Sequence, residues 1–445
     1  MTGHVTTVDY ALVRSLRSRV GEGLQAARAA ATAAGRPFPV GDERQFAWEL
    51  IADALREHTQ AELDAGRPVQ PPETDQQVIR AVHAALFGAG RIQPLLDDTT
   101  IENVDINGCD EVFISYTGGR VEPGSRVADD DDELIELVRT LGAYAGLNAR
   151  AFDPANPQLD LRLPDGSRLS AVMSATARPA VSIRRNRFPR VFLADLVENG
   201  SVPPSVAAFL RAAVLARKNI MIAGATNAGK TTLLRALINE IPPEERLVTV
   251  ERSLELGLRA NRDLHPNVVE MEEVQPNSEG AGGVNLADLV RRTLRMNPSR
   301  VIVGEVLGPE VVTMLNAMSQ GSDGSLSTIH ARTARDVFHR IATYALQATE
   351  HMNPTTAHHL ISGALDFVVF LSRSKERRYI TEVLEVTGYD GQVLASPLFR
   401  PEYPHGLAVT NEDTRLREDR ERELAAYGYQ HAADQWVTFD QRAVI

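Results

Sequence analysis

The chain has 445 residues, with 47 basic and 59 acidic side chains and a net charge of -12 at pH 7. Single hydrophobic cores stop growing near about 250–300 residues, so this length predicts several domains. The apolar fraction of 43% and the charged fraction of 24% are typical of an ordinary globular protein. The acidic balance argues against a dedicated nucleic-acid-binding protein, whose affinity would depend on neutralising phosphates.

Cysteine content and hydropathy indicate the compartment. The single cysteine, Cys109, excludes an intrachain disulfide framework and fits a reducing environment. No apolar run approaches the ~18–20 residues that span a bilayer, and the N-terminus lacks the apolar core of a signal peptide. We therefore expect a cytoplasmic protein that acts on a membrane only through a partner.

The first 93 residues predict a small helical module. A helix over Val8–Ala34 is followed by a second one that Asp42 can cap, and a third ends at Gly88. Apolar side chains recur at helical spacing in the second and third segments. We expect residues 1–93 to form this module.

Residues 94–195 change to short alternating runs separated by turns such as Asn107-Gly108. This pattern predicts an α+β domain with one helix over Asp132–Leu147. The expected strands are Ile101–Ile106, Glu111–Tyr116, Arg168–Met173 and Ala180–Arg184.

Residues 201–398 alternate helical segments with near-continuous apolar strands, which is typical of a largely parallel α/β sheet covered on both faces. The expected strands are Asn219–Ala223, Arg246–Glu251, Val301–Glu305, Ser325–His330 and Phe367–Ser372. Residues 399–445 are rich in charge and tyrosine without a strong period, so we expect a tail there, either a docking segment or a poorly ordered end.

The strongest motif, G-x-x-x-x-G-K-[ST], runs from Gly224 to Thr231 between an apolar strand and a helix expected over Lys230–Ile241. Such a loop wraps phosphates with backbone N–H groups, while Lys230 reaches the β- and γ-phosphates and the Thr231 hydroxyl holds Mg²⁺. A glycine-rich turn with an exposed lysine is the disfavoured alternative. The predicted ATP-binding residues are Gly224, Ala225, Thr226, Asn227, Ala228, Gly229, Lys230, Thr231 and Thr232.

A second acidic centre is needed to organise the metal and the attacking water. Glu305 ends a buried strand, which is where ligands bind at parallel sheets. We therefore predict Thr231 and Glu305 as the metal site, although a glutamate at a strand end is often only a solvated surface residue.

Two longer segments resemble a known family. Residues 294–306, LRMNPSRVIVGEV, are similar to LRMRPDRIIVGEVRG, and residues 321–331, GSDGSLSTIHA, are similar to GHDGSLSTIHA. Both motifs are typical of the type II/type IV secretion ATPase superfamily, and most closely of its tight-adherence pilus branch. The resemblance covers residues 90–390 and implies a homo-hexameric ATPase in which an N-terminal domain is hinged to a RecA-like domain.

The resemblance also assigns roles. Glu251 corresponds to the family's glutamate that orients or deprotonates water, Glu305 to its Walker B glutamate, and His330 to its γ-phosphate sensor. Arg168 and Arg184 fall in the segments from which the family supplies arginines to the nucleotide. In each case the alternative is an ordinary structural or solvated residue.

Arg292 and Arg295 are weaker candidates for the same task. The chain departs from the family pattern at Arg252, Leu307 and Ser322. Arg252 would place a positive charge beside Glu251, which we expect to favour its ionised form.

The favoured function is an ATP-hydrolysing motor for pilus assembly or protein secretion. The resemblance implies an inner-membrane platform protein as its partner, and hence a peripheral position at the inner face of the cytoplasmic membrane. An ATP-binding assembly scaffold with little hydrolysis is the alternative that the three departures suggest. A nucleic-acid translocase is disfavoured by the acidic balance, and a GTPase by the lack of an Asn-Lys-x-Asp run.

Overall fold

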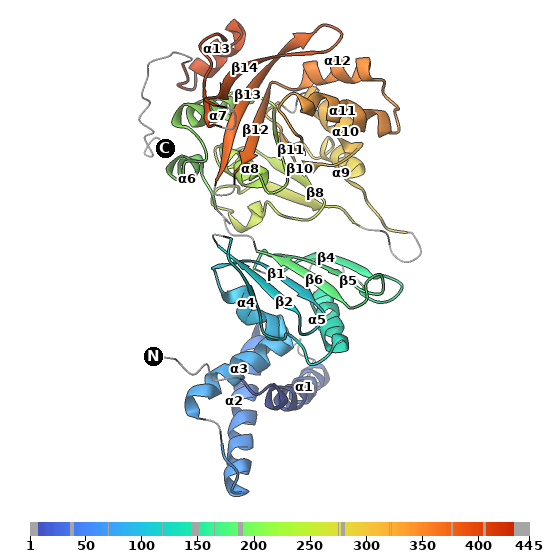
Figure 1. The fold of residues 1–445 in the computed structure, drawn as a ribbon. Helices are drawn as coiled ribbons and strands as arrows, with labels where there is room; N and C mark the ends of the chain where they lie inside the picture. The colour runs from blue at the N-terminus through green and yellow to red at the C-terminus, as the bar shows by residue number, and fades with distance from the viewer. Residues whose placement is uncertain are drawn as a thin grey trace. The chain divides into compact units, whose positions relative to one another are not determined.

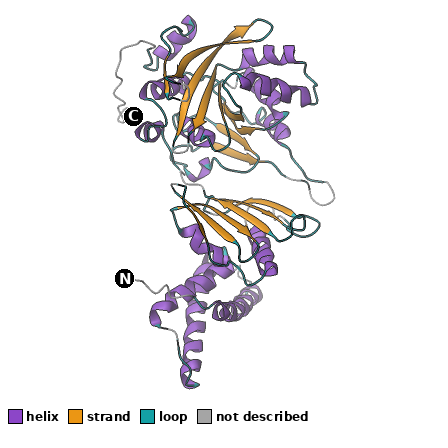
Figure 2. Ribbon diagram, in the orientation of Figure 1, coloured by secondary structure: helices purple, strands orange, loops and turns teal. Residues whose placement is uncertain are grey.

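The computed structural model divides the chain into two compact units, Met1–Arg187 and Phe188–Ile445 (Figures 1 and 2). The predicted fold class is confirmed: an α/β P-loop domain is preceded by an α+β domain and a small helical module. The structure describes residues 8–35, 40–69, 71–117, 119–144, 151–163, 165–185, 190–274, 276, 281–319, 321, 323–374, 377–403 and 406–430.

The first unit begins with the three predicted helices, α1 (Tyr10–Ala33), α2 (Val40–Asp64) and α3 (Pro72–Phe87). They enclose an apolar core that includes Leu16, Ile51 and Val82. The predicted cap of α2 is wrong, because the helix begins at Val40 and Asp42 lies in its first turn.

A six-stranded antiparallel sheet follows, in the order β3-β2-β1-β6-β5-β4. Apolar side chains of alternate positions, such as Val104, Leu161 and Ile183, bury one face of this sheet beneath helix α5. The two strands that sequence patterning missed, β3 and β4, lie at the sheet edges. The elements are η1 (Gly90–Ile92), α4 (Gln93–Asp97), β1 (Ile101–Asn107), β2 (Val112–Tyr116), β3 (Val121–Pro123), α5 (Asp131–Tyr144), β4 (Gln158–Arg162), β5 (Arg168–Val172) and β6 (Ala180–Arg184).

The second unit is built on a nine-stranded sheet in the order β15-β14-β13-β12-β7-β11-β10-β8-β9. The strands from β12 to β9 are parallel to their neighbours, whereas β13, β14 and β15 pair antiparallel. Its elements are α6 (Leu193–Glu198), α7 (Pro204–Leu215), β7 (Ile220–Gly224), α8 (Lys230–Ile238), β8 (Leu247–Glu251), η2 (Leu258–Ala260), β9 (Val268–Glu272), α9 (Leu286–Thr293), β10 (Arg300–Val306), α10 (Glu310–Ser319), β11 (Leu326–His330), α11 (Asp336–Gln347), α12 (Pro354–Ala364), β12 (Phe367–Arg373), β13 (Arg378–Tyr389), β14 (Val393–Pro401), β15 (Ala408–Thr410) and α13 (Glu418–Ala425).

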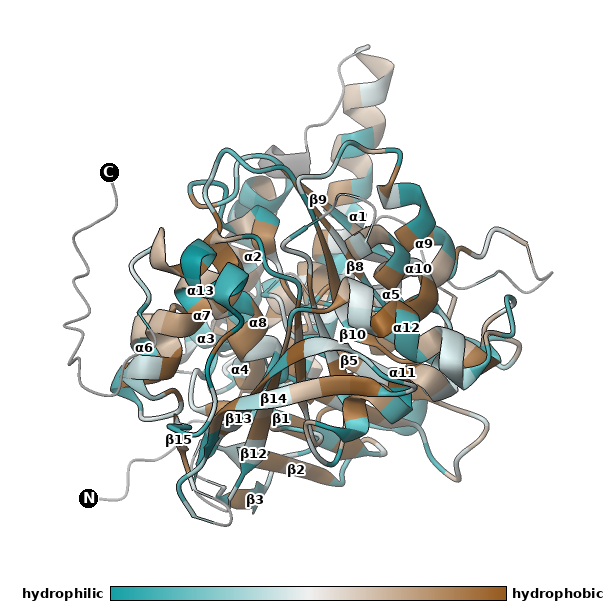
Figure 3. Ribbon diagram, turned by 90° about the horizontal axis from the view of Figure 1, so that it is seen from above, coloured by the Kyte–Doolittle hydropathy of each residue, from teal (hydrophilic) through white to brown (hydrophobic). Residues whose placement is uncertain are grey.

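Both faces of this sheet are covered by helices, as the apolar strands predict. In β7, Ile220 and Ile222 join the core beneath α6, α7 and α8. Met221 and Ala223 point the other way, into the core beneath α9 to α12. Figure 3 shows the contrast in hydropathy, with β8 mostly apolar and α13 mostly hydrophilic.

The predicted tail is not a separate segment between residues 399 and 430. Strand β14 runs through the expected boundary at 398, and β15 extends the sheet. Leu416, Leu424 and Tyr429 are buried in the core of the second unit. The packing of α13 against the core could not be recognised from the sequence, because the helix is mostly charged and has only a narrow apolar stripe. In the part of the chain that the structure describes, no helix has both the length and the hydropathy of a membrane span.

One buried histidine predicts acid sensitivity of the second unit. His265 is 2% exposed, and its Nε2 lies 2.9 Å from Asn239 Oδ1, so the neutral ring donates this hydrogen bond. Burial lowers the pKa of His265 to about 4. Its stabilising contribution is therefore complete above the unfolded value of about 6.5 and is lost as the pH falls toward 4.

We expect this loss to reach roughly 2–3 kcal/mol, since each pKa unit corresponds to about 1.4 kcal/mol. Calorimetric unfolding between pH 7.5 and 4.5 measures it. The His265→Gln variant keeps a donor for Asn239 without a titrating group, so its unfolding should depend less on pH. Equal pH dependence in both proteins would contradict the assignment.

Candidate active site

The candidate site lies where the parallel strands of the second unit end. Strands β7, β11, β10 and β8 are neighbours, and their carboxyl ends therefore meet at one edge of the sheet. Gly224, His330, Glu305 and Glu251 all stand at or near these ends. The structure thus gathers residues from four separate stretches of sequence at the position where open α/β sheets bind ligands.

The loop from Gly224 to Thr231 has the backbone geometry of a phosphate cradle. Asn227 and Gly229 adopt positive φ angles of 62° and 95°, which turn the chain sharply into α8. A side chain at Gly224 would come within 2.6 Å of the Leu371 carbonyl oxygen, so only glycine fits there. The N-cap of α8 is Gly229, which offers no side-chain cap to the first-turn N–H groups. These donors can therefore face an anion.

Lys230, His330 and Glu305 form one polar cluster behind this loop. Lys230 is 7% exposed, and its Nζ lies 3.2 Å from His330 Nδ1 and 3.8 Å from Glu305 Oε1. His330 Nε2 lies 2.9 Å from the same Glu305 oxygen. Burial, together with the Lys230 charge, lowers the pKa of His330, so the ring is neutral at pH 7. The network then assigns the proton to Nε2, which donates to Glu305 while Nδ1 accepts from Lys230.

Glu251 occupies a buried position at the end of β8. Its Oε1 accepts backbone N–H bonds from Glu255 and Leu256 at 2.9 and 3.0 Å. Its Oε2 is buried and has no hydrogen-bond partner among the described residues. Burial raises the pKa of Glu251 to about 8. Gly304 leaves the room for this side chain, since a Cβ there would come within 2.9 Å of the Glu251 Cγ.

The expected effect of Arg252 on Glu251 is wrong. The Arg252 side chain is 56% exposed, and its Nε lies 3.3 Å from Glu273 Oε2. The guanidinium therefore pairs with Glu273, which directly follows the neighbouring strand β9. Burial, and not a neighbouring cation, raises the pKa of Glu251. Of the other departures, Leu307 donates its backbone N–H to Glu310, and Ser322 lies outside the described residues.

The two predicted arginines of the N-terminal domain belong to the first unit. Arg168 on β5 and Arg184 on β6 are direct cross-strand partners. Arg162 on β4 stands opposite Arg168 in the same row. The three arginines therefore lie side by side in one row across β4, β5 and β6. Arg162 was not predicted from the sequence, although its spacing from the buried Leu159 and Leu161 indicates the opposite face of the sheet. Arg292 and Arg295 are exposed at α9 and just beyond it.

The residues present fit a nucleotide that brings its own magnesium ion. No group of three or more His, Cys, Asp or Glu side chains within the described ranges could hold a metal unaided. Mg²⁺ usually takes one or two protein ligands together with phosphate oxygens and water. Thr231, partly exposed in the first turn of α8, and Glu305 can supply these ligands.

Comparison with known proteins gives a consistent result. Residues 86–388 match the family model described as "Type II/IV secretion system protein". Type IV secretion system protein PtlH of Bordetella pertussis is 32% identical over 336 residues, which cover 68% of this chain and 95% of PtlH. Conjugal transfer protein TrbB of Rhizobium radiobacter is 29% identical, over 66% of this chain and 86% of TrbB. The crystal structure of the VirB11 ATPase from the Brucella suis type IV secretion system, in complex with sulphate, is 28% identical. It aligns with a TM-score of 0.36 over 69% of this chain and 96% of that one.

Proposed function

Because the chain belongs to the type II/IV secretion system protein family, we propose that it is an ATP-hydrolysing motor that powers pilus assembly or protein secretion. Its predicted membership in the type II/IV secretion ATPase superfamily is confirmed. Placement in the tight-adherence branch stays a proposal, as do the predicted domain boundaries at residues 93, 195 and 201. So does the alternative, an ATP-binding scaffold that scarcely hydrolyses.

The observation that carries the motor function is the convergence of Lys230, His330 and Glu305 behind the phosphate-binding loop. These groups come from α8, β11 and β10, which are separated by up to a hundred positions in the sequence. A scaffold that only binds ATP would not need a carboxylate and a neutral imidazole beside the P-loop lysine. The outward position of Arg252 leaves this cluster intact, which favours the motor over the scaffold.

Each side chain then has a proposed task. The loop N–H groups and Lys230 hold the β- and γ-phosphates, and Thr231 with Glu305 holds Mg²⁺, which neutralises phosphate charge when bound. Glu251 accepts a proton from the attacking water. The neutral His330 ring senses the γ-phosphate and donates a hydrogen bond to the Glu305 carboxylate. Arg168 and Arg184 add positive charge as the transferred phosphoryl group develops negative charge, so that closure of one domain on the other gates hydrolysis.

We further propose that six copies form a ring that transmits force to an inner-membrane platform protein. This partner would hold the motor at the cytoplasmic face of the membrane. Relatives of this chain are named for type IV secretion and for conjugal transfer. In this proposal the platform protein decides which process the motor serves.

The raised pKa of Glu251 predicts how turnover depends on pH. A carboxyl group with a pKa of about 8 is protonated at pH 7 and cannot accept a proton. Turnover should therefore rise as the pH increases from 6.5 to 9, by about tenfold per unit below the pKa. Steady-state phosphate release across this range measures the profile. In the Glu251→Gln variant the rate should be low and independent of pH; a flat profile in the wild-type protein would remove Glu251 from the role of base.

The function itself is tested on the purified full-length chain. Phosphate release is measured with Mg²⁺ and again with excess EDTA, and the Lys230→Ala protein reports any contaminating ATPase. A motor should hydrolyse ATP only with Mg²⁺ and should show the mass of six copies in native mass spectrometry. Tight ATP binding without phosphate release, even with the membrane partner present, would establish the scaffold instead.

A further inference from the structure

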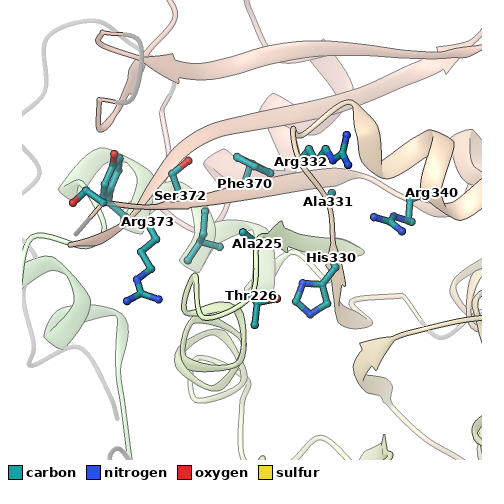
Figure 4. A pocket seen from close by; sticks show the side chains of 12 residues that line it. Ala225, Thr226, His330, Ala331, Arg332, Arg340, Phe370, Ser372 and Arg373 are labelled. Carbon is teal, nitrogen blue, oxygen red and sulfur yellow. The ribbon is translucent and has the colours of Figure 1, made fainter. Parts of the chain in front are cut away.

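A wide cationic pocket lies beside the P-loop in the second unit. It has a volume of about 870 Å³ and opens between the outer side of the loop, the start of α11 and the end of β12. Figure 4 shows Arg340 and Arg373 on opposite sides of Ala225 and Thr226, with Arg332 above Arg340. None of the described residues that line this pocket is acidic.

The arginines of this pocket are not neutralised by acidic side chains of the described residues. Within the described part of the chain, Arg332, Arg340 and Arg373 take part in no ion pair, although the protein carries 12 more acidic than basic side chains. Three unneutralised guanidinium groups around one opening create a positive potential that attracts an anionic partner.

Apolar as well as polar side chains line the pocket between the arginines, which bears on the size and kind of partner. Phe370, Leu371 and Ala331 form the floor, and Tyr379 is 8% exposed behind them. A lone phosphate would use the arginines but leave this floor unfilled. A nucleic acid would need a basic surface far larger than one pocket on an acidic protein. A protein surface that carries carboxylates among apolar groups can satisfy both features.

We propose that this pocket receives an acidic surface of a second copy of the chain. The inference rests on the proposed ring, because only an assembly brings another copy to this edge. The chain offers such a surface at the start of α5, where residues 129–133 are five consecutive acids. Three of them, Asp129, Asp131 and Glu133, pair with arginines of their own copy. Asp130 and Asp132 are exposed there, and neither forms an ion pair with any described residue.

The contact would couple assembly to the nucleotide. The pocket shares Thr226 with the P-loop and His330 with the cluster around Lys230. Arg340 and His330 line the same pocket, so a carboxylate that pairs with Arg340 neutralises a positive charge close to the site. A copy that docks or leaves therefore alters the surroundings of the γ-phosphate in its neighbour.

The test reverses the charge of two pocket arginines that have no assigned role in hydrolysis. We expect Arg332→Glu/Arg373→Glu to assemble only at a concentration at least tenfold higher than the wild-type chain, as measured by sedimentation and native mass spectrometry. ATP affinity of the unassembled variant should stay within about threefold. The matched control, Arg259→Glu/Arg400→Glu, reverses two exposed arginines elsewhere in the same unit and should assemble normally.

A second measurement identifies the occupant. A photo-crosslinking residue replaces Ser374 at the pocket rim, and the variant is mixed with isotope-labelled chain. We expect cross-links that join a labelled copy to an unlabelled one. Each should connect residue 374 of one copy to the acidic peptide that contains residues 129–133 of the other. Cross-links within one copy only would overturn the inference.

The outcomes separate this inference from the proposed function. A hexamer unaffected by the charge reversal would overturn only the inference. Normal assembly together with a large loss of ATP affinity would show that the pocket is a phosphate subsite, and would also overturn the inference. A wild-type chain that stays monomeric with and without ATP would overturn the ring and the inference together.

Discussion

Replacing Glu305 with glutamine is expected to lower ATP turnover by about 100- to 1000-fold, the range seen when one preorganised electrostatic group is removed from an active site. The carboxamide has nearly the same size, so the fold and the loop around Lys230 should persist. What is lost is the negative charge that lies 3.8 Å from Lys230 Nζ and accepts the His330 proton donor at 2.9 Å. ATP should still bind, because the loop N–H groups and Lys230 remain in place.

Phosphate release and binding of a fluorescent ATP analogue measure the two properties separately. The matched control is Glu244→Gln, an exposed acid of the same unit, which should leave both unchanged. Wild-type turnover in Glu305→Gln would remove Glu305 from the metal and water site. Loss of binding together with turnover would show that the carboxylate supports the loop rather than the reaction.

The strands that carry the site could be predicted within about one residue, because a sheet covered on both faces requires near-continuous apolar runs. The expected strand Val301–Glu305 appears as Arg300–Val306, and Phe367–Ser372 appears as Phe367–Arg373. The P-loop could be predicted equally well, because its phosphate-binding residues are consecutive in the sequence. What the spacing could not give was the distance between Lys230 and Glu305, which depends on the strand order.

Features that depend on tertiary contacts could not be predicted from the sequence. Strand β13 carries the charged residue Glu385, which the sequence alone suggests is exposed but which is completely buried between its antiparallel neighbours. Glu251 follows an ordinary strand pattern, yet burial against Gly304 sets its pKa. Arg252 was judged by its neighbour in sequence, whereas a strand points successive side chains to opposite faces. In each case the deciding contact is remote along the chain.

The C-terminal helix supplies the second large expected effect, since Arg420→Ala should lower the free energy of unfolding of the second unit by about 3–5 kcal/mol. Arg420 is 9% exposed, and its Nη1 donates to Glu385 Oε1 at 3.0 Å and to the Val386 carbonyl at 2.6 Å. Its Nη2 lies 2.8 Å from Asp366 Oδ1. Truncation leaves Glu385, which is completely buried, without its cation.

Burial already raises the pKa of Glu385, with Arg420 opposing that rise. Without Arg420 the carboxyl group should take up a proton as the pH falls, so the destabilisation should shrink in acid and grow above neutral pH. Urea unfolding at pH 6 and pH 8 measures this difference. The control Arg417→Ala breaks an exposed pair with Asp419 and should cost less than about 1 kcal/mol.

The effect should also reach the P-loop. Asp366 Oδ2 accepts the backbone N–H of Asn219, the residue before β7, at 2.9 Å. Arg420 therefore anchors an acid that orders the start of the strand leading to Gly224. Hydrogen exchange in β7 should quicken in Arg420→Ala and stay unchanged in Arg417→Ala. If hydrogen exchange in β7 is equal in both variants, Arg420 only attaches α13 to the sheet. In that case the helix covers the sheet without ordering the strand that leads to the phosphate-binding loop.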